Sequence, residues 1–261
     1  MCVVAFRIDQ NAKYPFVLIG NRDEFHTRPS NQIHQWDDKP SLYAGKDLKD
    51  KGTWLGISKN GKVATILNNP LPFSECVTYP KSRGQIVLDS LGNISDNTKH
   101  YLEHLQSERT MYRGYHLLFG TLNKITYYNN IDDNFKDIVT GLHSFSNTHD
   151  DLSSFRVLRS KEILAEHLKE NASIQVSKLV DDFHETQPNP ELVNLPDFIS
   201  YEEAVNRSSL FIQDREFGTV STTVVYVDQE GIVNMFERRY DANDNFEEKS
   251  LTFSLETDNE E

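Results

Sequence analysis

The strand-like segments of this chain come in blocks, and that order restricts the fold more than any other feature of the sequence. Apolar, β-branched runs at 3–8 and 16–20 flank a short polar stretch, which predicts a hairpin. A second pair, at 53–57 and 63–67, flanks an Asn-Gly dipeptide typical of tight hairpin turns. Single strands alternating with helices would favour a doubly wound parallel sheet, whereas blocks of strands favour antiparallel sheets covered by helices.

Helical periodicity follows the early strands and returns later in the chain. Apolar residues at helical spacing predict one helix near 86–91 and another near 101–105, the second with Ser95 or Asp96 as its N-cap. Residues 153–185 are predicted to form two helices, with Leu158 on the apolar face of the first. The remaining segments are predicted as strands at 115–120, 125–129, 220–227, 232–238 and 251–255, and as an irregular connection over 186–200.

The strands at both ends of the chain are apolar on both faces, so they need cover on both sides. We therefore expect an α+β protein, a four-layer αββα sandwich of two mainly antiparallel sheets between helix layers. A single domain over residues 1–255 is predicted, followed by an acidic, disordered tail over 256–261.

Composition and charge argue against several classes of partner. The 261 residues include 27 basic and 40 acidic side chains, a net charge of −13, which disfavours nucleic acid and anionic membrane surfaces. Two cysteines are too few for a disulfide framework, and no apolar run suits a signal peptide or an integral membrane segment. We expect a cytoplasmic protein with a small-molecule partner, and a local basic pocket for an anionic ligand is compatible with this charge.

Cys2 is the first candidate for chemistry. Removal of Met1 by an aminopeptidase, which a small second residue permits, would place a thiol and a free α-amine on one residue. An α-amine has a pKa of about 7.7 to 8.0, so it can act as a base at neutral pH and assist formation of the attacking thiolate. The alternative is that Cys2 is only a small apolar residue at the start of the first strand.

A polar cluster at 20–24 directly follows the second predicted strand. If the first two strands pair, this cluster lies near Cys2, because the first strand begins where its partner ends. An arginine there would lower the thiol pKa and an aspartate would accept hydrogen bonds from the α-ammonium; alternatively, the cluster is a solvated loop. Asn68 and Asn147 could donate amide hydrogens to an oxyanion, or could be ordinary turn residues.

No metal site is predicted. His100 and His104 are four residues apart on one face of a predicted helix, a spacing that can hold a metal ion. The pattern contains no third ligand, and the interleaved Lys99 and Glu103 are typical of a solvated face. Cys76 lies in a proline-bounded loop without Cys or His at metal-binding spacing and is interpreted as an incidental thiol.

Several short blocks make the sequence similar to a known family. Asn21-Arg22-Asp23-Glu24 follows an N-terminal strand that starts with Met1-Cys2. Later blocks include Arg28-Pro29, Gly52-Thr53-Trp54-Leu55-Gly56, Asn60-Gly61-Lys62-Val63-Ala64, Ser82-Arg83-Gly84, Tyr112-Arg113-Gly114-Tyr115 and 217–223. Together they cover nearly the whole chain, which resembles the NRDE family, also called the transport and Golgi organisation 2 family.

This resemblance implies a branch of the N-terminal nucleophile hydrolases, whose fold is an αββα sandwich. A local likeness to the penicillin V acylase and bile salt hydrolase group implies that Cys2 is the nucleophile and that Arg22 and Asp23 set the thiol and the amine. By the same likeness, Asn68 and Asn147 hold the substrate or the oxyanion. The candidate substrate-binding residues within the shared blocks are Asn21, Glu24, Trp54, Arg83 and Thr222.

The sequence departs from the family pattern at three places. Lys51 replaces the first glycine of the usual Gly-Gly-Thr-Trp, and the usual Pro-Trp after Asn147 is missing. Val220 stands where the family has an arginine that would lie in the cleft, and Arg207 or Arg215 are the candidates to replace it. These departures bear on the substrate and leave the cluster around Cys2 intact.

Two functions are compatible with these residues. The first is an N-terminal-cysteine hydrolase, without a cofactor, that acts on a non-peptide amide or acyl bond. In the alternative, the protein binds a ligand without catalysis. The resemblance implies haem, or acyl-CoA and lipid-like anions, as ligands in intracellular trafficking. Arg22 and Arg83 would bind the anionic group of the ligand. Cys2 or a histidine would then ligate haem iron. A scaffolding role in the secretory pathway has no membrane segment, lipidation site or basic patch to support it.

Overall fold

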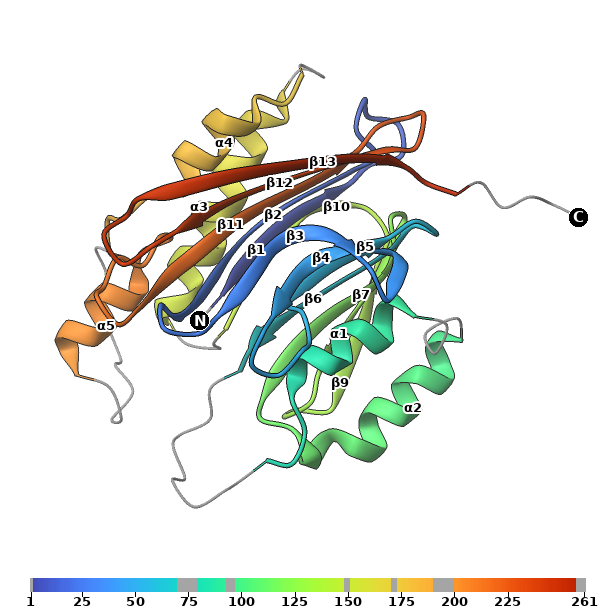
Figure 1. Cartoon of the computed structure of the whole chain (residues 1–261), viewed down its shortest axis with the longest axis horizontal. Helices are drawn as coiled ribbons and strands as arrows, with labels where there is room; N and C mark the ends of the chain where they lie inside the picture. The colour runs from blue at the N-terminus through green and yellow to red at the C-terminus, as the bar shows by residue number, and fades with distance from the viewer. Residues whose placement is uncertain are drawn as a thin grey trace, which may run out of the picture.

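A computed structural model of the chain describes residues 2–69, 79–92, 97–147, 151–169, 173–189 and 200–256, and for residues 151–154 the backbone only. Met1, Cys76 and residues 257–261 of the predicted tail lie outside these ranges. The described strands form two antiparallel sheets, which pack face to face between helices (Figure 1). This is the four-layer αββα arrangement that the order of strands and helices predicts.

The first sheet contains both ends of the described chain. Its order is β10-β1-β2-β11-β12-β13, so the N-terminal hairpin lies beside the C-terminal meander. Its strands are β1 (Val3–Ile8), β2 (Phe16–Phe25), β10 (Gly141–Ser146), β11 (Phe217–Val227), β12 (Ile232–Tyr240) and β13 (Phe246–Ser254).

The second sheet is a meander, since every strand pairs with its neighbour in sequence. Its order is β3-β4-β5-β6-β7-β8-β9. Its strands are β3 (Ser30–Trp36), β4 (Lys39–Asp47), β5 (Leu55–Ser58), β6 (Lys62–Asn68), β7 (Tyr115–Thr121), β8 (Lys124–Asn129) and β9 (Asn134–Ile138).

Helices cover the outer face of each sheet (Figure 1). The second sheet is covered by α1 (Arg83–Leu91) and α2 (Thr98–Glu108), which continues into a short 3₁₀ helix (Arg109–Met111). The first sheet is covered by α3 (Asp151–His167) and α4 (Val176–Phe183), and α5 (Tyr201–Ser208) precedes β11. None of the described helices is both long enough and apolar enough to cross a membrane.

The alternation of side chains along β1 explains why its residues are apolar on both faces. Val4 and Phe6 pack between the two sheets, whereas Val3 and Ala5 pack against the outer helices. Successive side chains of a strand point to opposite faces, so a strand in the middle of four layers needs apolar residues at every position.

Two local predictions were wrong, and five elements were not predicted. The N-cap of α2 is Asn97, whose side chain accepts a hydrogen bond from the His100 backbone, rather than Ser95 or Asp96. Leu158 does not join the apolar face of α3, because 61% of its surface is exposed. Strands β3, β4, β9 and β10 and helix α5 were not predicted.

Candidate active site

The pairing of β1 with β2 brings the polar cluster beside Cys2. Val3 is opposite Asn21 in the ladder, so Cys2 lies next to Arg22 and Asp23. The cluster is not a solvated loop: β2 continues through it to Phe25, and β11 pairs with its other edge. A strand that is held on both sides keeps the alternation of side chains, and this sends consecutive residues of the cluster to opposite faces.

Asn21 and Asp23 point toward the helices and are fully engaged there. Thr222 Oγ1 donates to Asn21 Oδ1 at 2.7 Å, and Asn21 Nδ2 donates to the Leu210 carbonyl at 3.0 Å. Asp23 accepts hydrogen bonds from Thr219 Oγ1 at 2.7 Å and from Arg156, on α3, at 2.8 Å. Asn21 and Thr222, both expected to bind substrate, therefore lie on the helix side of the sheet.

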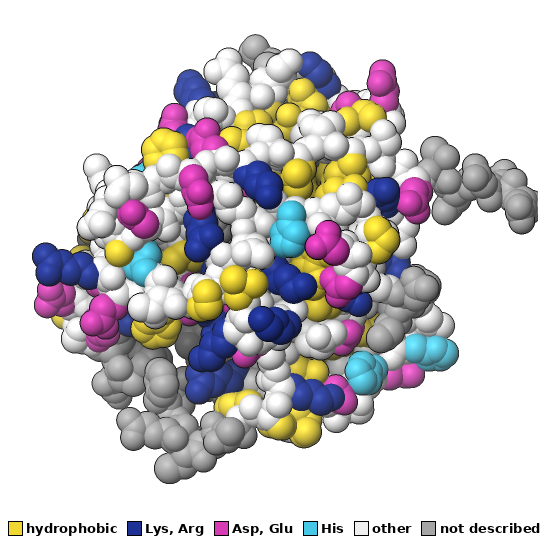
Figure 2. Space-filling model, in the orientation of Figure 1, with side chains coloured by type: hydrophobic (Ala, Val, Ile, Leu, Met, Phe, Trp, Pro, Cys, Tyr) yellow, Lys and Arg dark blue, Asp and Glu magenta, His cyan; other side chains and the backbone are white. Residues whose placement is uncertain are grey.

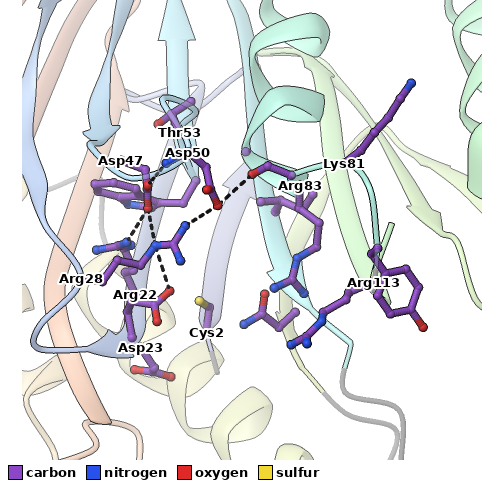
Figure 3. Close-up of a pocket in the computed structure, with 17 residues that line it drawn as sticks. Cys2, Arg22, Asp23, Arg28, Asp47, Asp50, Thr53, Lys81, Arg83 and Arg113 are labelled. Carbon is purple, nitrogen blue, oxygen red and sulfur yellow. Dashed lines mark hydrogen bonds and ion pairs between the residues drawn. The ribbon is translucent and has the colours of Figure 1, made fainter. Parts of the chain in front are cut away.

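The opposite face of β2 opens into a cavity of about 470 Å³. Figure 3 shows Cys2 near its centre, with Arg22 and Arg28 on one side and Arg83 and Arg113 on the other. Lys and Arg side chains also gather near the middle of the face drawn in Figure 2. The cavity is lined by Cys2, Arg22, Asp23, Glu24, Arg28, Asp47, Asp50, Thr53, Trp54, Ile66, Asn68, Tyr79, Lys81, Ser82, Arg83, Gly84 and Arg113.

The buried amide side chain of Asn147 holds the backbone of Cys2. The Cys2 backbone N–H donates to Asn147 Oδ1 at 2.5 Å, and Asn147 has no exposed surface. Asn147 Nδ2 is buried and has no hydrogen-bond partner among the described residues. Burial and, to a smaller extent, the charge of the Asp23 carboxylate raise the pKa of the Cys2 thiol, while the Asp23 backbone N–H and the charge of Arg22 act in the opposite direction.

One wall of the cavity is a network of paired charges. Asp47 accepts hydrogen bonds from Arg28 Nε at 2.5 Å and from Arg22 at 3.4 Å, and Arg28 also donates to Asp50 at 2.7 Å. Although burial acts to raise it, the hydrogen bonds from Arg28 and the Asp50 backbone hold the pKa of Asp47 below its usual range. Glu24 lies 3.7 Å from Arg28 Nε. Each cation on this wall therefore has a carboxylate partner.

The Trp54 ring supports this wall from one side. The Arg22 guanidinium lies over the ring, 4.1 Å from its centroid, a cation–π contact. The ring in turn lies against Gly45 of β4, where an added Cβ would overlap the indole. A glycine that never touches the cavity thus sets the position of the surface on which Arg22 rests.

The other wall begins at the N-terminus of α1, and its two arginines have no carboxylate partner among the described residues. Arg83 donates to the Gly114 carbonyl at 3.0 Å, and Arg113 makes no ion pair among the described residues. Burial and the nearby charge of Arg113 lower the pKa of Arg83. The hydroxyl of Ser82, the N-cap of α1, donates to Asp50 instead of capping the helix. Lys81 pairs with Glu108 at the rim.

A family model described as Transport and Golgi organisation 2 matches residues 1–242. The chain belongs to this family. It is 26% identical to the human Transport and Golgi organization protein 2 homolog, over 98% of this chain and all of the relative. It is 25% identical to the Drosophila melanogaster Transport and Golgi organization protein 2, over 91% of each chain.

Two solved structures are similar to this Transport and Golgi organisation 2 chain at low sequence identity. One is a Caenorhabditis elegans N-acylethanolamine-hydrolyzing acid amidase ortholog, with a TM-score of 0.52 at 8% identity over 86% of this chain and 92% of that one. The other is a mutant conjugated bile acid hydrolase from Clostridium perfringens, with a TM-score of 0.51 at 11% identity over the whole of both chains. The family member therefore has the fold of the N-terminal nucleophile hydrolases, as the sequence predicts.

This member of the Transport and Golgi organisation 2 family has Val220 where the family has a cleft arginine. Neither of the two candidates to replace it, Arg207 and Arg215, lines the cavity. Val220 is buried at a bulge in β11, between Thr219 and Ser221. Arg207 pairs with Glu203 on α5 and lines a separate, smaller pocket, and Arg215 does not line the cavity.

The structure brings most of the predicted site residues together, and it adds others. Cys2, Arg22, Glu24, Asn68, Trp54 and Arg83 line the cavity with Asp23, whose carboxylate faces away, and Asn147 contacts Cys2 from behind. Sequence reasoning did not single out Arg28, Asp47, Arg113 or Arg156 as site residues. The Arg28 and Arg113 blocks were visible as motifs, whereas nothing in the local sequence marks Asp47 or Arg156.

One buried carboxyl, that of Glu237, lies between the two sheets, on the face of the first sheet that packs against the second. Glu237 of β12 accepts hydrogen bonds from the Ile33 backbone of β3 at 3.2 Å and from Thr223 Oγ1 at 3.3 Å. Burial raises the pKa of Glu237 to about 7. This side chain joins an edge of the second sheet to the middle of the first.

Proposed function

We propose that this protein is an N-terminal-cysteine hydrolase that cleaves a non-peptide amide or acyl bond of a small molecule, with Cys2 as the nucleophile. The observation that carries the proposal is the position of Cys2: its thiol lines the cavity while its backbone nitrogen is held by Asn147. Removal of Met1 would turn that nitrogen into an amine already positioned beside the thiol, so one residue would supply nucleophile and base.

The first half of the reaction forms a thioester. The Cys2 amine takes the thiol proton, and the sulfur attacks the acyl carbonyl of the substrate. The tetrahedral oxyanion accepts hydrogen bonds from amide donors, for which Asn147 Nδ2 and Asn68 are the candidates; one well-placed donor is worth roughly 3 kcal/mol. The C–N or C–O bond then breaks, and the leaving group takes the proton from the ammonium.

The second half consumes water. The amine of Cys2 removes a proton from a water molecule, whose oxygen attacks the thioester carbonyl. Collapse of this second intermediate breaks the C–S bond, returns the proton to the sulfur and releases a carboxylic acid. The cavity volume of about 470 Å³ falls in the range of sites that hold small-molecule ligands.

The test begins with the mass of the purified native protein, because the mechanism requires loss of Met1. The species lacking Met1 is then assayed against N-acylethanolamines and conjugated bile acids, the substrate classes in the names of the two similar solved structures. We expect hydrolysis that Cys2→Ala reduces by at least about a thousandfold. Cys76→Ala is the matched control and leaves the rate unchanged. Retention of Met1 on the active protein, or equal turnover in Cys2→Ala, would contradict the proposal.

The second candidate is an anion-binding protein that uses the same cavity without chemistry. The cations lining the cavity of an otherwise acidic chain favour it. Among the described residues that line the cavity, Cys2 and Tyr79 are the side chains suited to haem iron. A haem titration therefore separates the candidates: a Soret shift that disappears in Cys2→Ala supports binding, and its absence at micromolar protein counts against haem.

A further inference from the structure

The two walls of the cavity differ in how their charges are balanced. On the β2 and β4 side, Arg22 and Arg28 are held by Asp47, Asp50 and Glu24. On the α1 side, neither Arg83 nor Arg113 has a carboxylate partner within the described part of the chain. A paired guanidinium is already satisfied, whereas an unpaired one that is partly removed from water gains most from binding an anion.

Three features converge on the α1 side. Arg83 is half-buried, and its contact with the Gly114 carbonyl leaves most of its five N–H donors available. Arg113 is exposed, and Figure 3 shows it beside Arg83 on the same wall. The first turn of α1 lines this wall and adds the positive end of its helix dipole.

This wall and the Cys2 thiol border the same cavity (Figure 3). Arg83 lines it together with Cys2, and the Cys2 thiolate acts to raise the pKa of Arg83. The chain as a whole carries a net charge of −13, so a local group of cations is not the consequence of a basic surface. It marks the place on this molecule where an anion is attracted.

We infer that Arg83 and Arg113 form an anion-binding subsite, and that the molecule which reaches Cys2 carries a carboxylate, sulfonate or phosphate group bound between them. The inference rests on the proposed function only where it calls that molecule a substrate. Guanidinium pairs bind the oxygens of such groups with charge-assisted, bidentate hydrogen bonds. A neutral acyl amide of the same size would leave both arginines without a partner.

The experiment compares two alkylating reagents of nearly equal size, anionic iodoacetate and neutral iodoacetamide. Each alkylates the Cys2 thiolate: the S–C bond forms at the CH₂ carbon as the C–I bond breaks, which transfers a carboxymethyl or carbamoylmethyl group and releases iodide. Peptide mapping separates Cys2 from Cys76. The ratio of the iodoacetate rate to the iodoacetamide rate measures attraction of an anion to the thiol. We expect Arg83→Gln and Arg113→Gln each to lower this ratio by about three- to tenfold, because each removes one charged hydrogen-bond donor group.

The controls separate an anion subsite from an effect on the fold or on the thiol. Arg215→Gln removes an exposed arginine outside the cavity and leaves the ratio unchanged. Arg113 is exposed, so its variant folds normally, and Arg83→Lys, which keeps the charge but not the bidentate geometry, lowers the ratio less than Arg83→Gln does. If both reagents slow equally in the Gln variants, the arginines act on the thiol alone and the inference is overturned. An unchanged ratio in the double variant overturns it as well.

This measurement does not depend on turnover. If Met1 is retained and no hydrolysis occurs, the proposed function fails while the reagent ratio still reports the subsite. If the ratio does not respond to the arginines while Cys2-dependent hydrolysis persists, the subsite fails and the hydrolase remains.

Discussion

The two faces of β2, one toward the helices and one toward the cavity, carry polar residues of the same motif in different surroundings. Toward the helices, the side chains of Asn21 and Asp23 are buried and form their hydrogen bonds with other groups of the protein. Toward the cavity, Arg22 and Glu24 border a space that a ligand can enter. Four consecutive residues therefore divide by strand alternation into one pair that holds the sheet to its helices and one pair that borders the cavity.

This division teaches that a short motif can combine residues that stabilise the fold with residues that border a cavity. Variants of the helix face should lower stability and leave the reactivity of the surviving fold nearly unchanged. Variants of the cavity face should do the reverse. Measurements of stability and of reactivity on variants of each face test that separation.

Arg156→Met should give the largest loss of stability, because it leaves the Asp23 carboxylate buried without its cation. Both side chains are at most 2% exposed, and breaking such a pair costs about 3 to 5 kcal/mol of the free energy of unfolding. Denaturant unfolding measures the change. Arg159→Met, on the same helix, is the control: its pair with Glu185 is one-third exposed and is worth less than about 1 kcal/mol. Equal effects of the two variants would contradict a structural role for the helix face.

Asn147→Ala should affect reactivity more than stability. The variant removes the acceptor of the Cys2 nitrogen and the unpartnered Nδ2 donor. The loss of one oxyanion donor lowers kcat by about 10²- to 10³-fold, so we expect at least that decrease. The assay uses a substrate from the hydrolase screen, with circular dichroism as the measure of folding. A rate within threefold of the unaltered protein would remove Asn147 from the mechanism.

Glu237→Gln should change how stability depends on pH. The folded pKa of about 7 exceeds the ordinary value of 4.5, so the folded state binds more protons than the unfolded state between these pH values. The free energy of unfolding therefore falls as pH rises from about 4.5 to 7, by about 3 kcal/mol in total from this group. Glu237→Gln removes that slope, and Glu230→Gln, at an exposed turn, retains it. An identical slope in both variants would show that other groups determine it.

Thr222→Val should have the smallest effect, and it tests the helix face alone. It removes the donor to Asn21 Oδ1, which lowers the free energy of unfolding by about 1 to 2 kcal/mol. Thr252→Val, which removes an exposed hydrogen bond to Asn234, changes stability by less than about 0.5 kcal/mol. The iodoacetamide rate at Cys2 stays the same in both variants. A large change in that rate would show that the two faces are coupled.

Much of the fold could be predicted, because strands buried on both faces are apolar at nearly every position. Two of the missed strands, β3 and β9, contain few buried residues, whereas β4 has a buried run from Leu42 to Gly45 that was overlooked. In β3 only Ile33 and Trp36 are buried, so its sequence has no apolar alternation. Helix α5 had a signal that was overlooked, since Ser200 and Glu203 form a capping box at its start.

The site was predictable where it depends on neighbouring strands and not where it depends on distant ones. The hairpin signal alone places Arg22 near Cys2. The pairing of Asp23 with Arg156 spans 133 residues, and that of Arg28 with Asp47 requires β3 and β4, which were not predicted. Which arginines remain unpaired depends on all these contacts, so the difference between the two walls cannot be obtained from composition.

The contact between Gly45 and the Trp54 ring has a consequence for how this sequence can change. The space beside the indole admits a hydrogen atom and no methyl group, so any other residue at position 45 displaces the ring on which the Arg22 guanidinium rests. Position 45 has no polar side chain, yet it is therefore among the positions least tolerant of substitution. A chain that diverges freely on its surface must keep this glycine for as long as it keeps the tryptophan.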